Sequence, residues 1–282
     1  MATLVRKGKK AMVTSSGYVH KRSFKAHKDV VNCFVIGETY LFTASNDKTI
    51  KKWSLEGGVL IATLGMEDSE RKLVQQKRTN NQKHEPDIPG HEQGVCSLCL
   101  SDDFLYSGSF DCTIKKWNIT DHSCITTFRG HSEAVYAVCV GAGFVLSGSR
   151  DMTIKVWNEQ EAERDSEGRN KDGKAPRERE GKCTATLKGH TGPVLAIIVQ
   201  DRMLYSGSDD STIKLWDWRS GAEVRTYVGH QAGVTAVKVA DPSLYSTSFD
   251  ATLRVWNLKT AQCLRVCRAE SGLKSLDLGG GK

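Results

Sequence analysis

Short apolar runs, each closed by a turn signal, recur along most of the chain. One unit reads AVYAVCV at 134–140, the turn GAG at 141–143, FVLSGS at 144–149, a tight turn at 150–151 and TIKVW at 153–157. Apolar and β-branched runs bounded by turns predict antiparallel strands. The first run is apolar almost throughout, which indicates burial on both faces. The last run alternates between apolar and polar residues, which indicates a half-buried strand.

The unit occurs five times with its positions in register. A fourth apolar stretch, such as CITTFRGH at 124–131, precedes the next unit. Counting from a histidine that starts each unit, a valine follows at 4, hydroxyl residues at 16 and 18, an acid at 20 and a tryptophan at 26. Such self-similarity is typical of a repeat architecture in which each unit is one small sheet. The histidines, acids and tryptophans are His27, Asp47 and Trp53; His91, Asp111 and Trp117; His131, Asp151 and Trp157; His190, Asp210 and Trp216; and His230, Asp250 and Trp256.

This pattern resembles the WD-repeat β-propeller family, in which Gly-His opens a repeat and Trp-Asp, or here mostly Trp-Asn, closes it. The resemblance covers about residues 16–278. It implies an all-β propeller, a WD-repeat β-propeller with five recognisable blades. Partial strands at both ends, YVHKRSF before His27 and SGLKSLDLGGGK at the C-terminus, predict that the chain is part of a six- or seven-bladed ring. The repeats lie near 26–53, 90–117, 130–157, 189–216 and 229–256.

The resemblance also gives the repeated residues a structural role. It implies a buried tetrad in each blade, in which the histidine donates to the aspartate and the tryptophan N–H donates to a strand hydroxyl. Either of the two hydroxyls could complete the tetrad. A serine, a histidine and an acid also suggest a hydrolase triad. A catalytic site is unique in a chain, however, so five copies favour the structural interpretation.

The unequal spacing of the repeats predicts two insertions. Successive Gly-His positions are 64, 40, 59 and 40 residues apart, so the plain unit has 40 residues. The extra segments fall at about 66–89 and 158–181, on connections that belong to opposite faces of a propeller. Both are charged and lack aromatic residues, which is typical of disorder. We interpret them as tolerated loops, with a docking role as the alternative.

The resemblance places two sets of residues at the mouth of the central channel, namely those before the turn acids and those five positions after each histidine. Two phenylalanines precede turn acids, where polar residues are expected. An aromatic surface that also carries arginine is typical of an interaction hot spot. The alternative is that the rings pack against a neighbouring blade. The predicted partner-binding residues are Phe110, Tyr136, Arg150, Leu195, Phe249 and Asn32.

Charge adds a second candidate function. The net charge is +7, and residues 1–28 hold eight basic side chains and no acid, so the rest of the chain sums to −1. A basic N-terminal arm at 1–15, ahead of the propeller at 16–282, could bind RNA or another polyanion, and such binding would weaken steeply with salt. The alternative is a solvated tail.

Three further motifs give weaker hypotheses. Residues 216–219, Trp-Asp-Trp-Arg, resemble the box through which some WD-repeat proteins act as substrate receptors of cullin–RING ubiquitin ligases; Asp217 and Arg219 would contact the adaptor, and a chance match is the alternative. Cys96 and Cys99 look like half a zinc site, but no second pair follows and the two side chains would point to opposite faces of one strand. We interpret Cys99 as a core residue, like Cys139 at the same repeat position. Basic residues two positions before each tryptophan could form a ring for nucleic acid or serve a local role. These are Lys51, Lys115, Lys155, Lys214 and Arg254.

The remaining features exclude several classes. The sequence has no phosphate-binding loop, dinucleotide fingerprint or metal cluster, so we expect no cofactor, no small-molecule substrate and no enzymatic activity. We expect no membrane association, because no run reaches the length of a membrane span. Nine cysteines without disulfide spacing favour a reducing compartment, cytoplasmic or nuclear, for a protein that is not secreted. The leading hypothesis is a scaffold for protein or peptide partners.

Overall fold

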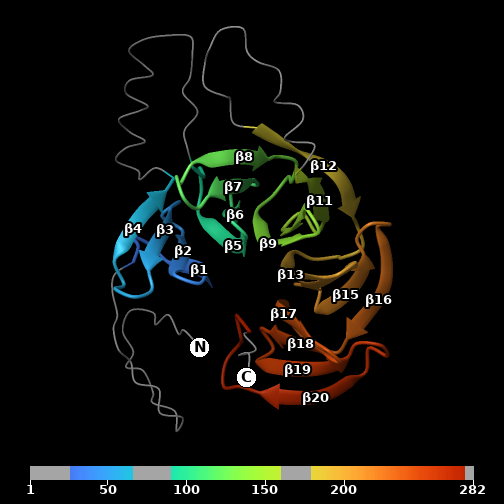
Figure 1. Cartoon of the computed structure of the whole chain (residues 1–282). Helices are drawn as coiled ribbons and strands as arrows, with labels where there is room; N and C mark the ends of the chain where they lie inside the picture. Colours follow the sequence, from blue (N-terminus) through green and yellow to red (C-terminus); the bar gives the residue numbers. More distant parts are fainter. Residues whose placement is uncertain (1–25, 66–89, 160–178, 277–282) are drawn as a thin grey trace.

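The computed structural model describes residues 26–65, 90–159 and 179–276, and these form twenty β-strands in five blades around a common centre (Figure 1). Blade 1 consists of β1 (Val31–Ile36), β2 (Tyr40–Ser45), β3 (Ile50–Ser54) and β4 (Leu60–Leu64). Blade 2 consists of β5 (Val95–Ser101), β6 (Phe104–Ser109), β7 (Ile114–Asn118) and β8 (Cys124–Phe128). Blade 3 consists of β9 (Val135–Gly141), β10 (Phe144–Ser149), β11 (Ile154–Asn158) and β12 (Arg179–Leu187).

The last two blades repeat the same order. Blade 4 consists of β13 (Val194–Gln200), β14 (Met203–Ser208), β15 (Thr212–Asp217) and β16 (Ala222–Val228). Blade 5 consists of β17 (Val234–Ala240), β18 (Ser243–Ser248), β19 (Thr252–Asn257) and β20 (Cys263–Arg268). Within every blade consecutive strands pair antiparallel, from the innermost to the outermost. The all-β propeller with five blades that the sequence predicts is therefore confirmed.

The hydrophobic core lies between the blades rather than inside one of them. Each of four apolar clusters combines the middle of one blade with the tryptophan side of the next. The ring of Phe128 on β8 meets that of Trp157 in blade 3 at 5.8 Å, and Tyr227 on β16 meets Trp256 in blade 5 at 6.0 Å. A single four-stranded sheet could not bury these large rings, so the blades depend on their neighbours for stability.

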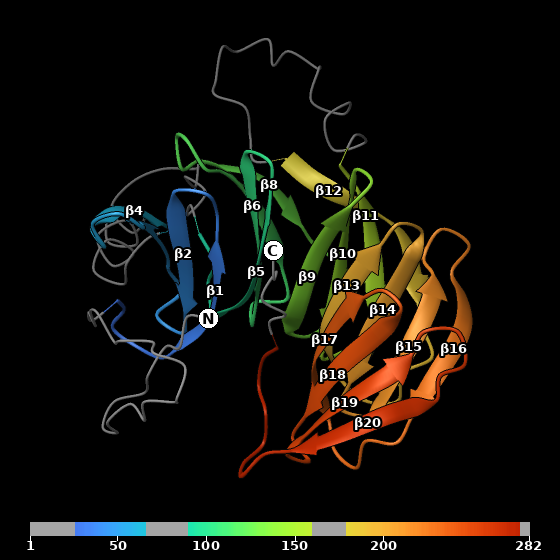
Figure 2. The same cartoon turned by 60° about the horizontal axis from the view of Figure 1, so that its bottom comes forward.

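The ring of described blades is open. The innermost strands β1, β5, β9, β13 and β17 pack side by side in that order, but in the described residues β17 and β1 lack this packing. Figures 1 and 2 both show blades 1 and 5 on opposite sides of the opening. The C-terminal stretch predicted as the first strand of a sixth repeat forms no strand within its described part. Instead, the Leu273 N–H donates to the Ser248 carbonyl and the Thr235 hydroxyl donates to the Leu273 carbonyl.

The second predicted insertion is shorter than the sequence suggests. Asn158 ends β11, and residues 179–181 already belong to β12, where they pair parallel with Thr126–Phe128 of β8. This pairing joins blades 2 and 3 at their outer edges. A Cβ on Gly181 would lie 1.9 Å from Cδ1 of Phe128, so only glycine fits there. The first insertion, residues 160–178 of the second, and the basic arm lie outside the described residues.

Candidate protein-interaction face

Each blade contains the hydrogen-bonded tetrad that the resemblance implies. In blade 3 the Trp157 indole N–H donates to Ser147 Oγ at 2.9 Å, and Ser147 Oγ lies 2.8 Å from His131 Nε2. The other ring nitrogen, Nδ1, donates to Asp151 at 2.7 Å. The sequence left the choice of hydroxyl open, and the structure selects the first of the pair. The five tetrad hydroxyls belong to Thr43, Ser107, Ser147, Ser206 and Ser246.

The second hydroxyl of each pair stabilises the turn instead. Ser149 Oγ donates to the carbonyl of Glu133 at 3.0 Å and accepts the Asp151 N–H at 3.0 Å. Asp151 in turn accepts the backbone N–H of Thr153 at 3.0 Å. These bonds hold a left-handed residue between the acid and the threonine, at a φ of 66° for Met152. Non-glycine residues adopt this conformation only at an energetic cost, so the turn aspartate serves as its local support.

The polar groups of the tetrad are all occupied by hydrogen bonds within the blade, as blade 3 shows. Burial by itself would raise the pKa of Asp151, but hydrogen bonds from His131 and Thr153 outweigh it and hold the pKa well below its ordinary value. The carboxylate is therefore ionised and already saturated with donors. Ser147 is completely buried and holds both the indole and the imidazole. A substrate cannot reach this buried hydroxyl. The tetrad therefore has a structural role, because its hydrogen bonds hold neighbouring strands of the blade together.

The structure brings three of the predicted partner-binding residues together. The rings of Phe110 in blade 2 and Tyr136 in blade 3 meet edge to face at 6.1 Å. Burial raises the pKa of Tyr136 while the charge of the nearby Arg150 opposes that rise. Phe110 remains 36% exposed although it contacts the next blade, and Phe249, at the same turn of blade 5, is 49% exposed. The Phe110 ring thus packs on its neighbour and still faces solvent, and its role in binding a partner stays a prediction.

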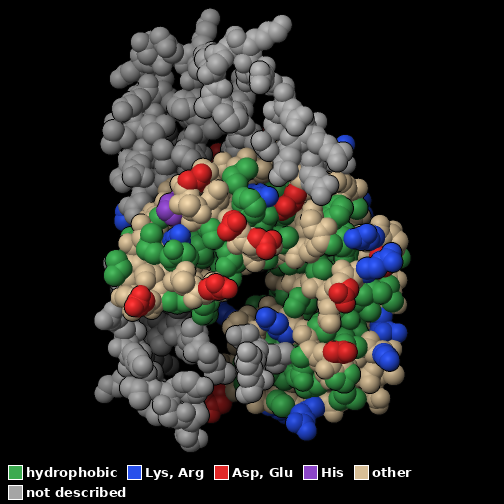
Figure 3. Space-filling view, viewed as in Figure 1, with side chains coloured by type: hydrophobic (Ala, Val, Ile, Leu, Met, Phe, Trp, Pro, Cys, Tyr) green, Lys and Arg blue, Asp and Glu red, His purple; other side chains and the backbone are tan. Residues whose placement is uncertain are grey.

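A loop glycine lets the Phe110 ring lie close to the backbone. A Cβ on Gly94 would approach Cα of Asn46 to 2.9 Å and Cδ2 of Phe110 to 3.1 Å. Both contacts are tighter than ordinary packing, so a larger residue would displace the ring. The space-filling view in Figure 3 shows a hollow at the centre of the ring, with hydrophobic, acidic and basic side chains around it.

The other predicted partner-binding residues differ in whether their side chains are available to a partner. Arg150 is exposed and forms a salt bridge with Glu133, with 3.1 Å between Nε and Oε2; such an exposed pair separates at little cost. Leu195 is half-buried. The amide of Asn32 donates to Asn46 at 2.7 Å and to the Val95 carbonyl at 2.9 Å. Asn32 therefore joins blades 1 and 2, and its donors are committed within the protein.

The Trp-Asp-Trp-Arg segment closes β15. Asp217 accepts the N–H of Arg219 at 3.1 Å and so supports the following turn. The Arg219 guanidinium lies over the ring of Trp218, 5.2 Å from its centre. Trp218 is buried and packs against Phe144 of blade 3 at 5.2 Å. Sequence reasoning did not predict that Trp218 packs between blades 3 and 4. The signal was available, because no other repeat has a tryptophan at this position.

The cysteine motif and the basic positions have local roles. Burial raises the pKa of Cys96 to about 12, which keeps it a thiol, and the described residues contain no cluster of three potential metal ligands. Lys115 is buried and donates to Thr127 on the next strand at 2.7 Å. This bond is a local role of the kind that the sequence offers as the alternative to a basic ring for nucleic acid. No helix in the described ranges has the length and apolarity needed to cross a membrane.

Comparison with known proteins agrees with this geometry. The sequence model described as "WD domain, G-beta repeat" matches more than half of the chain, at residues 18–54, 82–118, 122–158, 181–217 and 221–257. The chain belongs to the WD40 family. Every matched WD40 segment ends one residue after a tetrad tryptophan. The repeats recognised from spacing are therefore those of the family.

Two curated relatives share shorter stretches of WD40 sequence. "Mitochondrial division protein 1" of Schizosaccharomyces pombe is 33% identical over 113 residues, which are 40% of this chain and 17% of that protein. "Probable E3 ubiquitin ligase complex SCF subunit sconB" of Arthroderma benhamiae is 46% identical over 46 residues, which are 16% of this chain and 7% of that protein. The similarity thus spans less than a fifth of either relative.

Two solved structures resemble the whole propeller. "Crystal structure of RRP9 WD40 repeats" and "Structure of U3-55K" each superpose with a TM-score of 0.69 at 23% identity. They cover 88% of this chain, which in turn covers 66% and 67% of theirs. At this level of identity the similarity shows the fold.

Proposed function

We propose that this WD40 propeller is a non-enzymatic scaffold that binds protein or peptide partners through the channel mouth around Phe110, Tyr136 and Arg150. The observation that carries the proposal is the pair of exposed phenylalanines, Phe110 and Phe249, at turns where the fold needs only a polar residue. The repeat does not require an aromatic ring at this turn, because the corresponding positions in the other blades are Asn46, Arg150 and Asp209.

The chemistry of this surface suits a protein partner. Aromatic rings and arginine supply most of the binding energy at protein interfaces. Phe110 and Tyr136 already hold each other edge to face, so little side-chain entropy is lost when a partner covers them. Arg150 can exchange its exposed salt bridge with Glu133 for a carboxylate of the partner.

The test is a pull-down from cell lysate read by mass spectrometry, with and without nuclease. The variant is Phe110→Ala, Tyr136→Ala and Phe249→Ala combined. The matched control replaces two exposed valines at other positions, Val59→Ala and Val228→Ala, which are 63% and 72% exposed. Circular dichroism establishes that both proteins are folded. We expect partners that resist nuclease, persist with the control and are lost with the triple variant.

Other outcomes would move the function elsewhere. Partners that nuclease removes and the triple variant keeps would favour RNA binding through the N-terminal arm. Binding of a ubiquitin-ligase adaptor that disappears in Arg219→Ala would favour the receptor hypothesis, in which Asp217 and Arg219 make the contact. A cytoplasmic or nuclear location is also proposed, supported by nine free cysteine thiols.

A further inference from the structure

The basic residue before each tetrad tryptophan has a different hydrogen-bonding environment in blade 5. The residue two positions before each tetrad tryptophan is basic in every blade, and in three blades its ammonium donates to a threonine on the outermost strand. These bonds are Lys115 to Thr127 at 2.7 Å, Lys155 to Thr186 at 3.0 Å and Lys214 to Thr226 at 3.2 Å. In blade 5 the pair is Arg254 and Val266, which lie opposite each other on β19 and β20. Blade 5 thus has a guanidinium where no hydroxyl can accept its hydrogen bonds.

Arg254 also has no carboxylate partner of the kind that Lys214 has in blade 4. Lys214 donates to both carboxylate oxygens of Glu223 at 2.8 Å, and Glu223 lies opposite the tetrad tryptophan. The corresponding residue in blade 5 is Cys263, whose Sγ is 3.9 Å from Nη1 of Arg254. Nε of Arg254 is buried without a hydrogen-bond partner among the described residues. A buried unpartnered donor is costly and indicates a position where an acceptor is expected.

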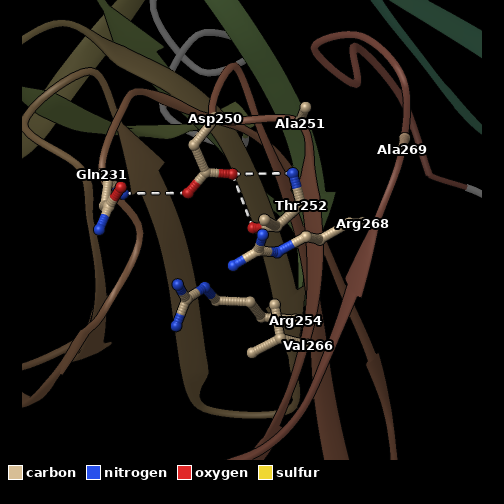
Figure 4. Close-up of a pocket in the computed structure, with 8 residues that line it drawn as sticks. All are labelled: Gln231, Asp250, Ala251, Thr252, Arg254, Val266, Arg268 and Ala269. Carbon is tan, nitrogen blue, oxygen red and sulfur yellow. Dashed lines mark hydrogen bonds between the residues drawn. The ribbon is translucent and has the colours of Figure 1, made fainter.

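A cavity lies beside Arg254, which forms part of its lining. Its volume is about 280 Å³, and its lining includes Arg254 and Thr252 of β19, Val266 and Arg268 of β20, and Gln231. Figure 4 shows the two guanidinium groups extending toward the same side of the cavity. The structure pairs neither arginine with an acid within the described ranges.

Asp250 also lines the cavity, but its oxygens are occupied. It accepts from His230 Nδ1 at 2.9 Å, from the Gln231 N–H at 3.0 Å and from the Thr252 hydroxyl at 2.6 Å. The free hydrogen-bonding groups at the cavity are therefore mainly the N–H donors of two arginines.

We propose that this cavity binds an oxyanion carried by a peptide partner, either a phosphate or a carboxylate side chain, between Arg254 and Arg268. Guanidinium groups bind such oxyanions through paired, charge-assisted hydrogen bonds. The volume lies below the roughly 300–1,000 Å³ of pockets for whole small molecules, so it fits a single side-chain group. The site is separate from the channel mouth and does not depend on the function proposed for it.

The surroundings favour a peptide over nucleic acid. β20 is the outermost strand of blade 5, and in the described residues no strand pairs with its outer edge, which could therefore take an added extended segment. Leu264 and Val266 on that strand are 56% and 45% exposed and offer apolar contacts beside the arginines. Single-stranded RNA needs a basic groove that follows many phosphates, whereas this cavity presents only two arginines, with the carboxylate of Asp250 beside them.

The experiment measures fluorescence anisotropy of labelled valine-rich five-residue peptides added to the full chain at low salt. The central residue is phosphoserine, glutamate or serine, so that phosphate, carboxylate and neutral groups are compared. Unlabelled inorganic phosphate and a short oligouridine serve as competitors. We expect one or both anionic peptides to bind at least tenfold more tightly than the serine peptide, and more tightly than inorganic phosphate.

Two variants and a control locate the site. Arg268→Ala changes an exposed side chain and should weaken binding about tenfold or more, the effect of losing charged hydrogen bonds. Cys263→Glu should weaken it similarly, because it gives Arg254 the internal carboxylate that Lys214 has in blade 4. Lys259→Ala removes an exposed charge elsewhere on blade 5 and should leave affinity unchanged.

Four results would overturn the proposal. The first is equal binding of all three peptides, and the second is an equal loss in Lys259→Ala. The third is inorganic phosphate binding as tightly as the peptides, which would indicate a site for the free ion. The fourth is oligouridine displacing the peptides at lower concentration in an Arg268-dependent way, which would indicate nucleic acid. A Phe110→Ala, Tyr136→Ala double variant, whose positions lie on blades 2 and 3 and do not line the cavity, should keep peptide binding, which separates failure here from failure of the proposed scaffold face.

Discussion

Removing one tetrad hydroxyl tests whether the repeated residues are structural. In Ser147→Ala the Trp157 indole N–H and the His131 imidazole each lose their partner inside blade 3. Both groups are buried, so water cannot replace the serine. Leaving a buried polar group unsatisfied costs about 1–3 kcal/mol. The two groups together predict a loss of about 2–6 kcal/mol in the free energy of unfolding.

Urea denaturation followed by tryptophan fluorescence measures this loss. With a slope of about 3 kcal/mol per molar, the midpoint should fall by about 0.7–2 M. The matched control is Thr43→Ser in blade 1, which keeps the tetrad hydroxyl and gives that blade the serine found in the other four. It removes one methyl group and should cost about 1 kcal/mol. Each blade contacts only its neighbours, so hydrogen exchange should place the Ser147→Ala loss in blades 2 to 4.

A double variant makes the test stricter. Trp157→Phe removes the indole N–H that Ser147→Ala leaves without a partner, so the two costs should not add. We expect the double variant to be at least about 1 kcal/mol more stable than the sum of the single losses. Additive losses, or a loss for Ser147→Ala no larger than for Thr43→Ser, would refute the view that these hydrogen bonds hold the blade together.

Three further changes follow from the same structure. Asp151 and its four counterparts have pKa values below that of an unfolded carboxyl, so the unfolded chain binds more protons in acid; stability should be complete above about pH 5 and fall steadily below about pH 4, as a pH series of urea midpoints would show. Gly181→Ala would place a Cβ against Phe128 and should lower protection of the outer strands of blades 2 and 3 in hydrogen exchange, whereas a loss spread over all blades would contradict this. Trp218→Ala removes the ring that packs on Phe144 and should cost about 3–5 kcal/mol, which thermal unfolding would measure.

The repeated part of the molecule could be predicted from the sequence because its hydrogen bonds impose fixed spacings. A histidine reaches the turn aspartate of its own blade only when the strands between them have a set length, so His131, Asp151 and Trp157 are visible as offsets. The choice between Ser147 and Ser149 could not be predicted. Residues two apart on a strand point to the same face, and only coordinates show which oxygen lies beside the indole.

Contacts between units were harder to predict. Trp218 meets Phe144 across a blade boundary, and no periodic rule connects the two positions. The stretch around Leu273 has the alternating pattern of a strand, but a strand also needs a hydrogen-bonded neighbour. Leu273 instead meets the turn carbonyl of Ser248 and the hydroxyl of Thr235. Pattern alone therefore predicted a strand that tertiary pairing does not provide in the described part of this stretch, up to residue 276.

The repeat itself shows where function is best sought. A residue type found at one position in every blade has an explanation in the fold, as with the lysines that donate to a neighbouring threonine. A residue that differs from its counterparts in the other blades is not explained by the fold when it leaves an apolar ring exposed to solvent or a hydrogen-bond donor without an acceptor. Phe110 departs in the first way and Arg254 in the second, on different blades and with different chemistry. Arg254 differs from the lysines of blades 2, 3 and 4 because it has no threonine opposite it, so its site becomes visible by comparison within the same chain.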